Sequence, residues 1–180
     1  MCQAQITFII HQLRTFYYGR IPDERGNDTA MKKKIDPKSR MHSAEHLLNQ
    51  TMIRMFDCGR CFSAHIEKKK SKCDYHFDRP LTEKEIREIE EQVNDVIKAD
   101  MLVTEEYIFK EEAQKHYKLE RLPDDAGEEL RIVKIGDYDA CPCIGAHVNS
   151  SKEIGEFRIV SSSFEDWVLR IRYKVAQPAK

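Results

Sequence analysis

Hydrophobic residues recur at helical spacing in two segments of the chain. The first segment contains Ala44, Leu47, Leu48, Thr51 and Met55. This spacing predicts a helix over about 40–57, with Gly59 as a C-terminal stop. The second segment contains Ile86, Ile89, Val93, Val96 and Ile97. It follows Thr82 and Glu85, whose three-residue spacing predicts a capping box at the start of an amphipathic helix.

Alternating residues predict strands in much of the remaining chain. We expect a pair of short strands at 62–66 and 73–77, joined by a turn that contains Lys68, Lys69 and Lys70. Further strands are expected at about 102–109 and 130–135, with a short helix at about 111–117 between them. The last segments, 156–160 and 167–175, read as a hairpin with its turn at Ser161, Ser162 and Ser163.

The final strand has two contrasting faces. Its alternate residues Trp167, Leu169, Ile171, Tyr173 and Val175 are predicted to face the core. The intervening residues give a mostly basic outer face with Arg170, Arg172 and Lys174. Together the elements predict an α+β fold, in which an antiparallel or mixed β-sheet is packed by two main helices.

The first part of the chain has a different character. Residues 1–39 contain Gly19, Pro22, Gly26 and Pro37, and they show no helical or strand periodicity of any strength. A basic run of Lys32, Lys33 and Lys34 continues to Lys38 and Arg40. We therefore expect residues 1–39 to form an N-terminal appendage and basic linker, and residues 40–180 to form one domain.

Composition narrows the class of protein. The 180 residues are 41% hydrophobic and 34% charged, with a formal net charge of −1. The longest apolar run near the N-terminus is Phe8, Ile9 and Ile10, far short of the roughly 20 residues that a membrane span requires. Without a secretory signal pattern, a cytoplasmic protein is expected. The balanced charge argues against a strongly basic, non-specific nucleic-acid coat.

Histidine and cysteine pairs predict a metal site. His42 and His46 are one helical turn apart, so both imidazoles project from one helix face. Cys143 and His147 supply a thiolate and a third imidazole from a loop that contains Pro142 and Gly145. Three nitrogens and one sulfur suit Zn²⁺. Metal ligation is favoured over disulfides because no oxidising compartment is indicated.

Two alternatives use overlapping residues. The sequence from His42 to His46 also matches HxxEH, a zinc-protease pattern in which Glu45 would be the general base. That interpretation leaves the loop ligands unexplained and needs a peptide-binding cleft. A separate four-cysteine zinc site is the second alternative, with ligands Cys58, Cys61, Cys141 and Cys143.

The segments HSAEHLL, FSAHIEKKKSKCDYHFDRPLTEKEIREIEEQVNDVI and CPCIGAHV, in this order, resemble the editing domain of alanyl-tRNA synthetase and the freestanding AlaX-type editing proteins. The editing domain of threonyl-tRNA synthetase is a more distant match. The resemblance covers about residues 40–175. It implies that His42, His46, Cys143 and His147 bind one zinc ion. The family's loop usually reads CGGTH, whereas Ile144, Gly145 and Ala146 separate the ligands in this chain.

The resemblance implies an enzyme that hydrolyses the ester between tRNA and a wrong amino acid. We expect Ser- or Gly-tRNA(Ala) as the substrate, attacked in trans, with Ser63 as a candidate polar group at the substrate. Editing of Ser-tRNA(Thr) is the less favoured specificity. For tRNA phosphates, the candidate contacts are Lys68, Lys69, Lys70, Arg170, Arg172 and Lys174, together with the basic residues of the linker. A catalytically idle, zinc-stabilised domain that binds RNA or a protein is the alternative from another class.

Overall fold

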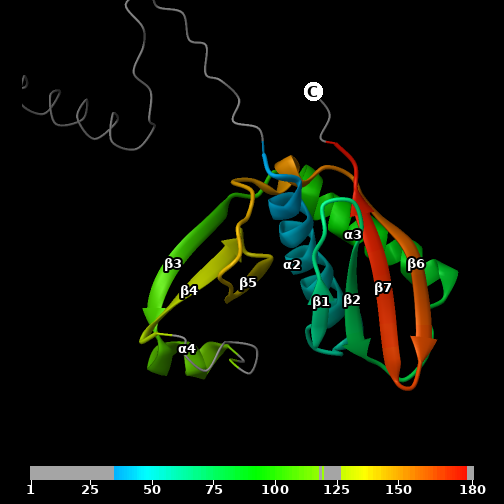
Figure 1. The fold of residues 1–180 in the computed structure, drawn as a ribbon, viewed down its shortest axis with the longest axis horizontal. Helices are drawn as coiled ribbons and strands as arrows, with labels where there is room; N and C mark the ends of the chain where they lie inside the picture. The colour runs from blue at the N-terminus through cyan, green and yellow to red at the C-terminus, as the bar shows by residue number, and fades with distance from the viewer. Residues whose placement is uncertain (1–34, 118, 120–126, 178–180) are drawn as a thin grey trace, which may run out of the picture. The chain divides into compact units, whose positions relative to one another are not determined.

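A computed structural model describes residues 35–117, 119 and 127–177, and its elements are labelled in Figure 1. The chain divides into two units, residues 1–34 and 35–180. The described helices are α2 (Pro37–Phe56), α3 (Glu83–Lys98) and α4 (Lys110–His116), with a 3₁₀ turn at Ser151–Ile154. The described strands are β1 (Ser63–His65), β2 (Ser71–His76), β3 (Val103–Phe109), β4 (Glu129–Ile135), β5 (Asp139–Pro142), β6 (Phe157–Glu165) and β7 (Val168–Val175). Lys32, Lys33 and Lys34 lie outside the described residues.

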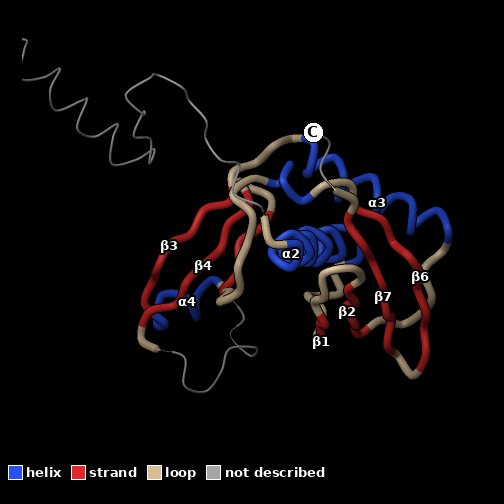
Figure 2. The backbone as a smooth tube through the Cα atoms, turned by 45° about the horizontal axis from the view of Figure 1, so that its top comes forward, coloured by secondary structure: helices blue, strands red, loops and turns tan. Residues whose placement is uncertain are grey.

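The strands form two antiparallel sheets, which confirms the predicted α+β class. One sheet has the order β1-β2-β7-β6 and the other has the order β3-β4-β5. Figure 2 shows α2 between the two sheets, and Figure 1 shows α3 behind the larger one. Both helices pack on the same face of the larger sheet, where the buried side chains of its central strands lie: Cys73, Tyr75, Leu169, Ile171 and Tyr173. Helix α2 therefore links the core to the smaller sheet.

Helix α2 begins three residues before its predicted start. The Asp36 carboxylate caps it by accepting from the Lys38 amide at 3.1 Å, and Pro37 occupies the first turn. The helix ends at Phe56, and Asp57 follows it in the left-handed conformation (φ 52°), two residues before the stop predicted at Gly59.

The buried position of Arg40 contradicts one prediction. We expected it in a basic linker that contacts tRNA, but its side chain is buried and donates to the Ile154 carbonyl at 2.6 and 2.9 Å. A third bond joins its Nε to the Glu153 carbonyl at 3.1 Å. The guanidinium holds the 3₁₀ turn against the start of α2, so it is a structural residue.

The capping box at the start of α3 is confirmed. The Thr82 hydroxyl accepts from the Glu85 amide, and the Glu85 carboxylate accepts from the Thr82 amide at 2.8 Å. Arg79 also donates to Glu85, at 2.7 and 2.9 Å. The bonds from Arg79 and then the Thr82 amide lower the pKa of Glu85 to about 2.

The C-terminal hairpin turns later than predicted. Ser161, Ser162 and Ser163 lie inside β6, next to an irregularity in the pairing between Ile159 and Ser161. Glu165 pairs with Val168, so the turn residues are Asp166 and Trp167. Trp167 was predicted to face the core but is 71% exposed. The serine run misled the prediction because a strand with one solvated face tolerates hydroxyl side chains.

Candidate metal centre

Helix α2 provides two of the predicted ligands. His42 and His46 are one turn apart, with ring centroids separated by 5.4 Å. His46 is buried at 2% exposure, whereas His42 is partly open to solvent. The difference arises because His46 lies deeper in α2, where β5 packs against the helix.

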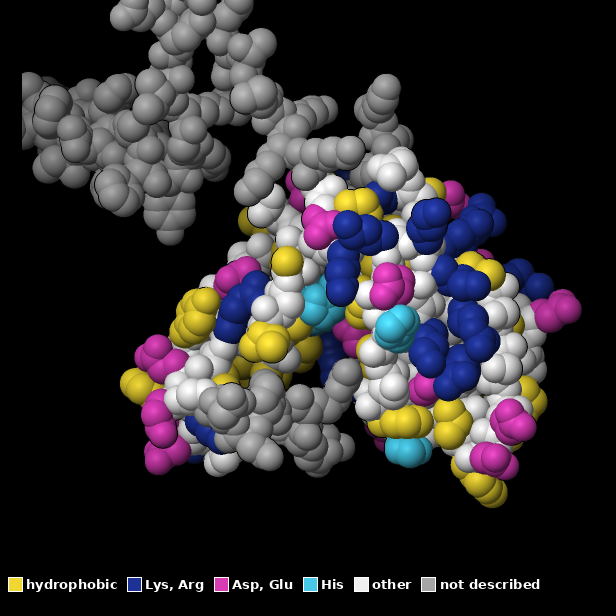
Figure 3. Space-filling view, in the orientation of Figure 1, with side chains coloured by type: hydrophobic (Ala, Val, Ile, Leu, Met, Phe, Trp, Pro, Cys, Tyr) yellow, Lys and Arg dark blue, Asp and Glu magenta, His cyan; other side chains and the backbone are white. Residues whose placement is uncertain are grey.

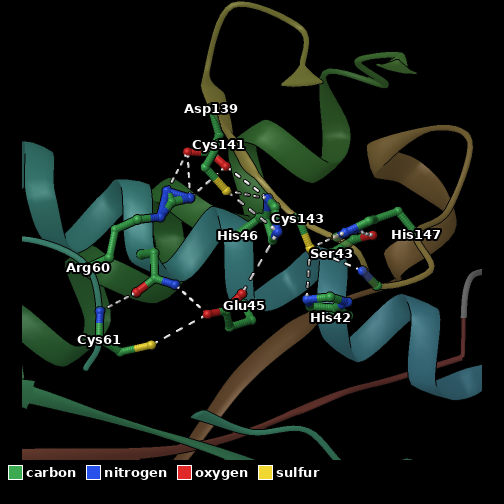
Figure 4. A network of polar contacts seen from close by, with 12 residues as sticks. His42, Ser43, Glu45, His46, Arg60, Cys61, Asp139, Cys141, Cys143 and His147 are labelled. Atoms are coloured by element: carbon green, nitrogen blue, oxygen red, sulfur yellow. Dashed lines mark hydrogen bonds and ion pairs between the residues drawn. The ribbon is translucent and has the colours of Figure 1, made fainter. Parts of the chain in front are cut away.

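Strand β5 delivers the other two ligands. The chain leaves β5 at Pro142, and the loop that follows lies beside α2, as Figure 4 shows. The Cys143 sulfur lies 3.5 Å from His42 Nε2 and 3.3 Å from His147 Nε2. One donor atom from each of His42, His46, Cys143 and His147 lies within 4.8 Å of the other three. The structure therefore brings together the four residues that the sequence nominated.

The size of this cluster suits zinc. With Zn–S near 2.3 Å and Zn–N near 2.0–2.1 Å, a tetrahedral centre separates its sulfur from each nitrogen by about 3.6 Å. The two sulfur–nitrogen distances of 3.3 and 3.5 Å are close to that value. Gly145 contributes to the fit, because a Cβ there would lie 2.0 Å from Cε1 of His42. Any larger residue at this position would require the His42 ring to move from its place in the cluster.

The electrostatics favour a thiolate. Burial disfavours the ionised sulfur, but hydrogen bonds from His147, His42 and His46 lower the pKa of Cys143 to about 3. Burial likewise disfavours a charged His46, yet its bond to Asp139 and its contacts with Cys141 and Cys143 raise its pKa well above the usual value. Metal ligation requires an ionised thiol and neutral imidazoles, so a bound divalent cation would take the place of the proton on His46.

A second layer of contacts holds two of the imidazoles. His46 Nδ1 lies 3.0 Å from the Asp139 carboxylate, which also receives three 2.8 Å bonds from Arg60. The Ser43 hydroxyl lies 3.0 Å from His147 Nδ1 and accepts from the Val148 amide at 3.2 Å. Such outer contacts fix the orientation of metal-binding histidines. The sequence prediction missed Asp139, Arg60 and Ser43.

Cys141 lies next to His46 and Asp139 and is not one of the four clustered residues. Its sulfur is 3.6 Å from His46 Nδ1, and together with Asp139 it forms another set of possible metal-ligating groups. The Arg60 guanidinium already bonds to both carboxylate oxygens of Asp139. Because this cation neutralises Asp139, a second metal ion beside it is disfavoured.

The four-cysteine alternative is not assembled in the described residues. The Cys58 thiol contacts the Met52 and Gly59 carbonyls at 3.7 and 3.5 Å, and burial raises its pKa to about 11. Cys61 is buried in a different group, with Glu45 and Cys73. These contacts separate Cys58 and Cys61 from Cys141 and Cys143.

The protease alternative is also disfavoured. The Glu45 side chain is buried and accepts from Asn49 Nδ2 at 2.6 Å and from the Cys61 thiol at 3.4 Å. These bonds engage one carboxylate oxygen, and the other lies 4.0 Å from Nε2 of His46, as Figure 4 shows. A general base must reach the water that it activates. Glu45 is buried and does not line the pocket beside the cluster, so its position does not favour that role.

A pocket of about 400 Å³ opens beside the cluster. Its lining includes His42 and Gly145 on one side, and Ala64 and His65 of β1 on the other. Ser63 is exposed and does not line this pocket, so its position does not support the predicted catalytic role. The polar side chain of β1 that lines the pocket is His65.

The predicted tRNA contacts lie on one face of the larger sheet and on an adjoining turn. Exposed between β1 and β2 are Lys68, Lys69 and Lys70. They directly follow Glu67 in the sequence, and Glu67 lines the pocket. Arg172 and Lys174 alternate with buried residues of β7, and Figure 3 shows Lys and Arg gathered over this region. Arg170 shares the face, but it donates two 2.7 Å bonds to Asp74.

Comparison with known proteins identifies related sequences. Residues 130–171 match the family described as threonyl and alanyl tRNA synthetase second additional domain. The alanine–tRNA ligase of Coxiella burnetii is 35% identical over 125 residues, covering 69% of this chain and 14% of that protein. That of Aeropyrum pernix is 35% identical over 140 residues, covering 74% and 15%. That of Methanopyrus kandleri is 29% identical over 145 residues, covering 78% and 16%. The chain thus spans about a seventh of the length of these relatives.

Among the described residues, no helix is long and apolar enough to cross a membrane.

Proposed function

We propose that this chain, which belongs to the family of alanyl-tRNA synthetase editing-type domains, hydrolyses the aminoacyl ester of mischarged tRNA in trans. Ser-tRNA(Ala) and Gly-tRNA(Ala) are the proposed substrates, and a cytoplasmic location is proposed because aminoacyl-tRNA is the substrate. One observation carries the proposal. The cluster of metal-ligating residues shares His42 with a pocket of about 400 Å³, large enough for a small aminoacyl group.

Zinc is the proposed cofactor, held by His42, His46, Cys143 and His147. When bound, it would supply a Lewis acid that polarises the ester carbonyl or lowers the pKa of a water molecule. The chain itself supplies the position of the substrate. His65 lines the same pocket as His42, and its imidazole, which lies 3.4 Å from Glu67, could hydrogen-bond the aminoacyl group or the terminal ribose. The small residues Gly145 and Ala146 leave room for the ester beside the ligands.

A closed shell of four protein ligands is typical of structural zinc, so the reaction needs one ligand that yields. His42 is the best candidate. Asp139 and Ser43 hold the second ring nitrogens of His46 and His147. Within the described residues, no hydrogen bond holds Nδ1 of His42, and this ring also borders the pocket. Displacement of His42 therefore breaks the fewest other contacts.

The tRNA contacts are proposed at the basic residues beside the pocket. Lys68, Lys69 and Lys70 adjoin the pocket end of β1, and Arg172 and Lys174 extend the positive surface along β7. Lys and Arg bind phosphates in a salt-dependent manner without reading sequence. Arg170 contributes less in this proposal, since its hydrogen bonds to Asp74 lower the pKa of that carboxyl and engage both guanidinium ends.

The test is release of amino acid from charged tRNA. Purified protein should free serine or glycine from tRNA(Ala) faster than it frees alanine, and Ser-tRNA(Thr) serves as the competing substrate. His46→Ala should lose both zinc and activity, whereas His116→Ala, an exposed histidine on α4, should keep both. Equal hydrolysis of Ala-tRNA(Ala) and Ser-tRNA(Ala), or full activity in His46→Ala, would reject the proposal.

The closed ligand set also favours one alternative function, a zinc-stabilised domain that binds RNA or a protein without catalysis. The same assay separates the two functions. A protein that contains one zinc ion per chain and binds tRNA, yet leaves Ser-tRNA(Ala) intact, would be the idle domain.

A further inference from the structure

Aromatic side chains gather at one end of the larger sheet, where β2 ends and β7 begins. They border a groove of about 540 Å³ whose lining includes Phe56, His76, Phe77, Arg79 and Trp167. We call it the end groove. Figure 3 shows hydrophobic side chains exposed at this end of the sheet, next to the surface where Lys and Arg gather. The metal cluster and its pocket use none of these residues.

Trp167 is held exposed in a strained conformation. It has a φ of +62°, and Asp166 before it has a φ of +49°. Two-residue hairpin turns of this kind favour Asn-Gly or Asp-Gly, because a bulky residue is disfavoured at positive φ. The Trp167 ring is 71% exposed, so it buries little apolar surface that would offset this strain. Strain combined with exposure points to a ring that is presented to a ligand.

A second flat surface lies close by. Phe62 and His76 stack face to face, with centroids 4.2 Å apart and an interplanar angle of 15°. Phe62 is 43% exposed, so this stack also meets solvent. Arg79 lies over the ring of Phe77, 5.6 Å from its centroid. Flat rings with an adjacent guanidinium are the elements with which proteins stack unpaired nucleobases.

The strand register connects the end groove to the basic surface and to the pocket. His76 pairs with Val168, and the next pair on the same face is Asp74 with Arg170, about 7 Å away along the strands. In the other direction, Phe62 is three residues before His65, which lines the pocket. That separation is about 10 Å, or about three nucleotides at the 3.4 Å rise of a stacked strand.

We propose that the Phe62–His76 stack and Trp167 at the end groove hold unpaired bases next to the 3′ end of tRNA while the terminal nucleotide occupies the pocket beside the metal cluster. This inference rests on the proposed function for its substrate. The basic face of β7 would bind the phosphates of the same strand. Stacking tolerates any base, so the end groove would add affinity without adding sequence preference.

The experiment uses uncharged tRNA, so that binding is measured apart from hydrolysis. Trp167 is the only tryptophan in the sequence, which makes intrinsic fluorescence a direct probe of this groove. Full-length tRNA should quench it, and the same tRNA without its unpaired 3′ nucleotides should quench it much less. Phe62→Leu keeps the probe and should weaken binding of full-length tRNA by about 5-fold to 100-fold.

Two further variants separate stacking from charge. Trp167→Gly suits the positive φ, so the hairpin should fold, and its binding of dye-labelled tRNA should weaken by a similar factor. The dependence of its affinity on salt should stay unchanged, whereas Arg172→Ala should lower the slope by about 1. Phe109→Leu, an exposed aromatic residue on the other sheet, is the matched control.

The outcomes are distinct. If tRNA binds but neither its 3′ end nor the Phe62→Leu and Trp167→Gly variants affect the binding, the stacking site is rejected and the proposed function stands. If tRNA does not bind at all, both are rejected. If tRNA binds without quenching Trp167, the placement of a base on Trp167 is rejected.

Discussion

Asp139→Asn tests how the metal centre is supported, because it keeps the shape of the side chain and removes its charge. The carboxylate has two partners: His46 Nδ1 at 3.0 Å, and the Arg60 guanidinium through bonds of 2.8 Å. Its side chain is fully buried, whereas the Arg60 side chain is 23% exposed. The substitution therefore weakens the orientation of one ligand and leaves a partly buried cation without its counter-charge.

The two effects have different sizes. Loss of an outer contact to a metal-binding histidine typically lowers metal affinity by about 10-fold to 100-fold, or roughly 1.4–2.7 kcal/mol. Breaking a buried ion pair costs about 3–5 kcal/mol of folding free energy. Because Arg60 can reach water in part, we expect the lower end, about 3 kcal/mol.

Two companion variants separate these effects. Arg60→Ala removes the ion pair but keeps the bond that His46 Nδ1 donates to Asp139, so it should destabilise the fold while zinc affinity changes less than about threefold. Asp137→Asn, an exposed aspartate in the preceding turn, should change neither quantity. Zinc affinity is measured by competition with a chromophoric chelator, and stability by urea unfolding. If Asp139→Asn and Arg60→Ala bind zinc equally well, Asp139 does not position His46.

Three other predictions follow from the geometry. Gly145→Ala should lower zinc affinity at least about 10-fold, because the added Cβ would lie 2.0 Å from the His42 ring and displace it. The control is Gly127→Ala, where nothing lies within 4 Å of the added Cβ, and it should leave zinc binding unchanged. Glu85 has a pKa of about 2 against an ordinary 4.5, so the stability that it contributes is present above pH 4.5 and is lost as the pH falls toward 2. Urea unfolding of Glu85→Gln should then show a flatter acid limb across that window, and an unchanged limb would contradict the assignment. His42→Ala should retain more zinc by elemental analysis than His46→Ala, and the reverse order would contradict the ranking of the two ligands.

The cluster of candidate metal ligands was predictable because its signals are local. His42 and His46 are four residues apart, and so are Cys143 and His147, and each pair can be recognised without knowledge of the fold. The capping box at Thr82 was predictable for the same reason. These features depend on side chains that a single helix or loop already brings together.

Features that depend on contacts between distant segments were not predictable. Arg60 and Asp139 are 79 residues apart, and no spacing rule links them. Strand β5 is short and its alternation is weak, so no local pattern indicated that Asp139 would lie against α2. Arg40 sits in a basic run, and only the position of the Ile154 carbonyl determines that it is buried.

The four ligands share one cluster but differ in how firmly the protein holds them. His46 is buried and fixed by an ion-paired carboxylate, His147 is fixed by a serine, and Cys143 receives hydrogen bonds that favour its thiolate. The His42 ring contacts the Cys143 sulfur through Nε2 and stacks on the His147 ring at 4.4 Å, but among the described residues no hydrogen bond holds its Nδ1. Outer hydrogen bonds fix the orientation of metal-binding histidines. The candidate ligand without such a bond is the one that borders the pocket, which favours His42 as the group that a substrate would displace.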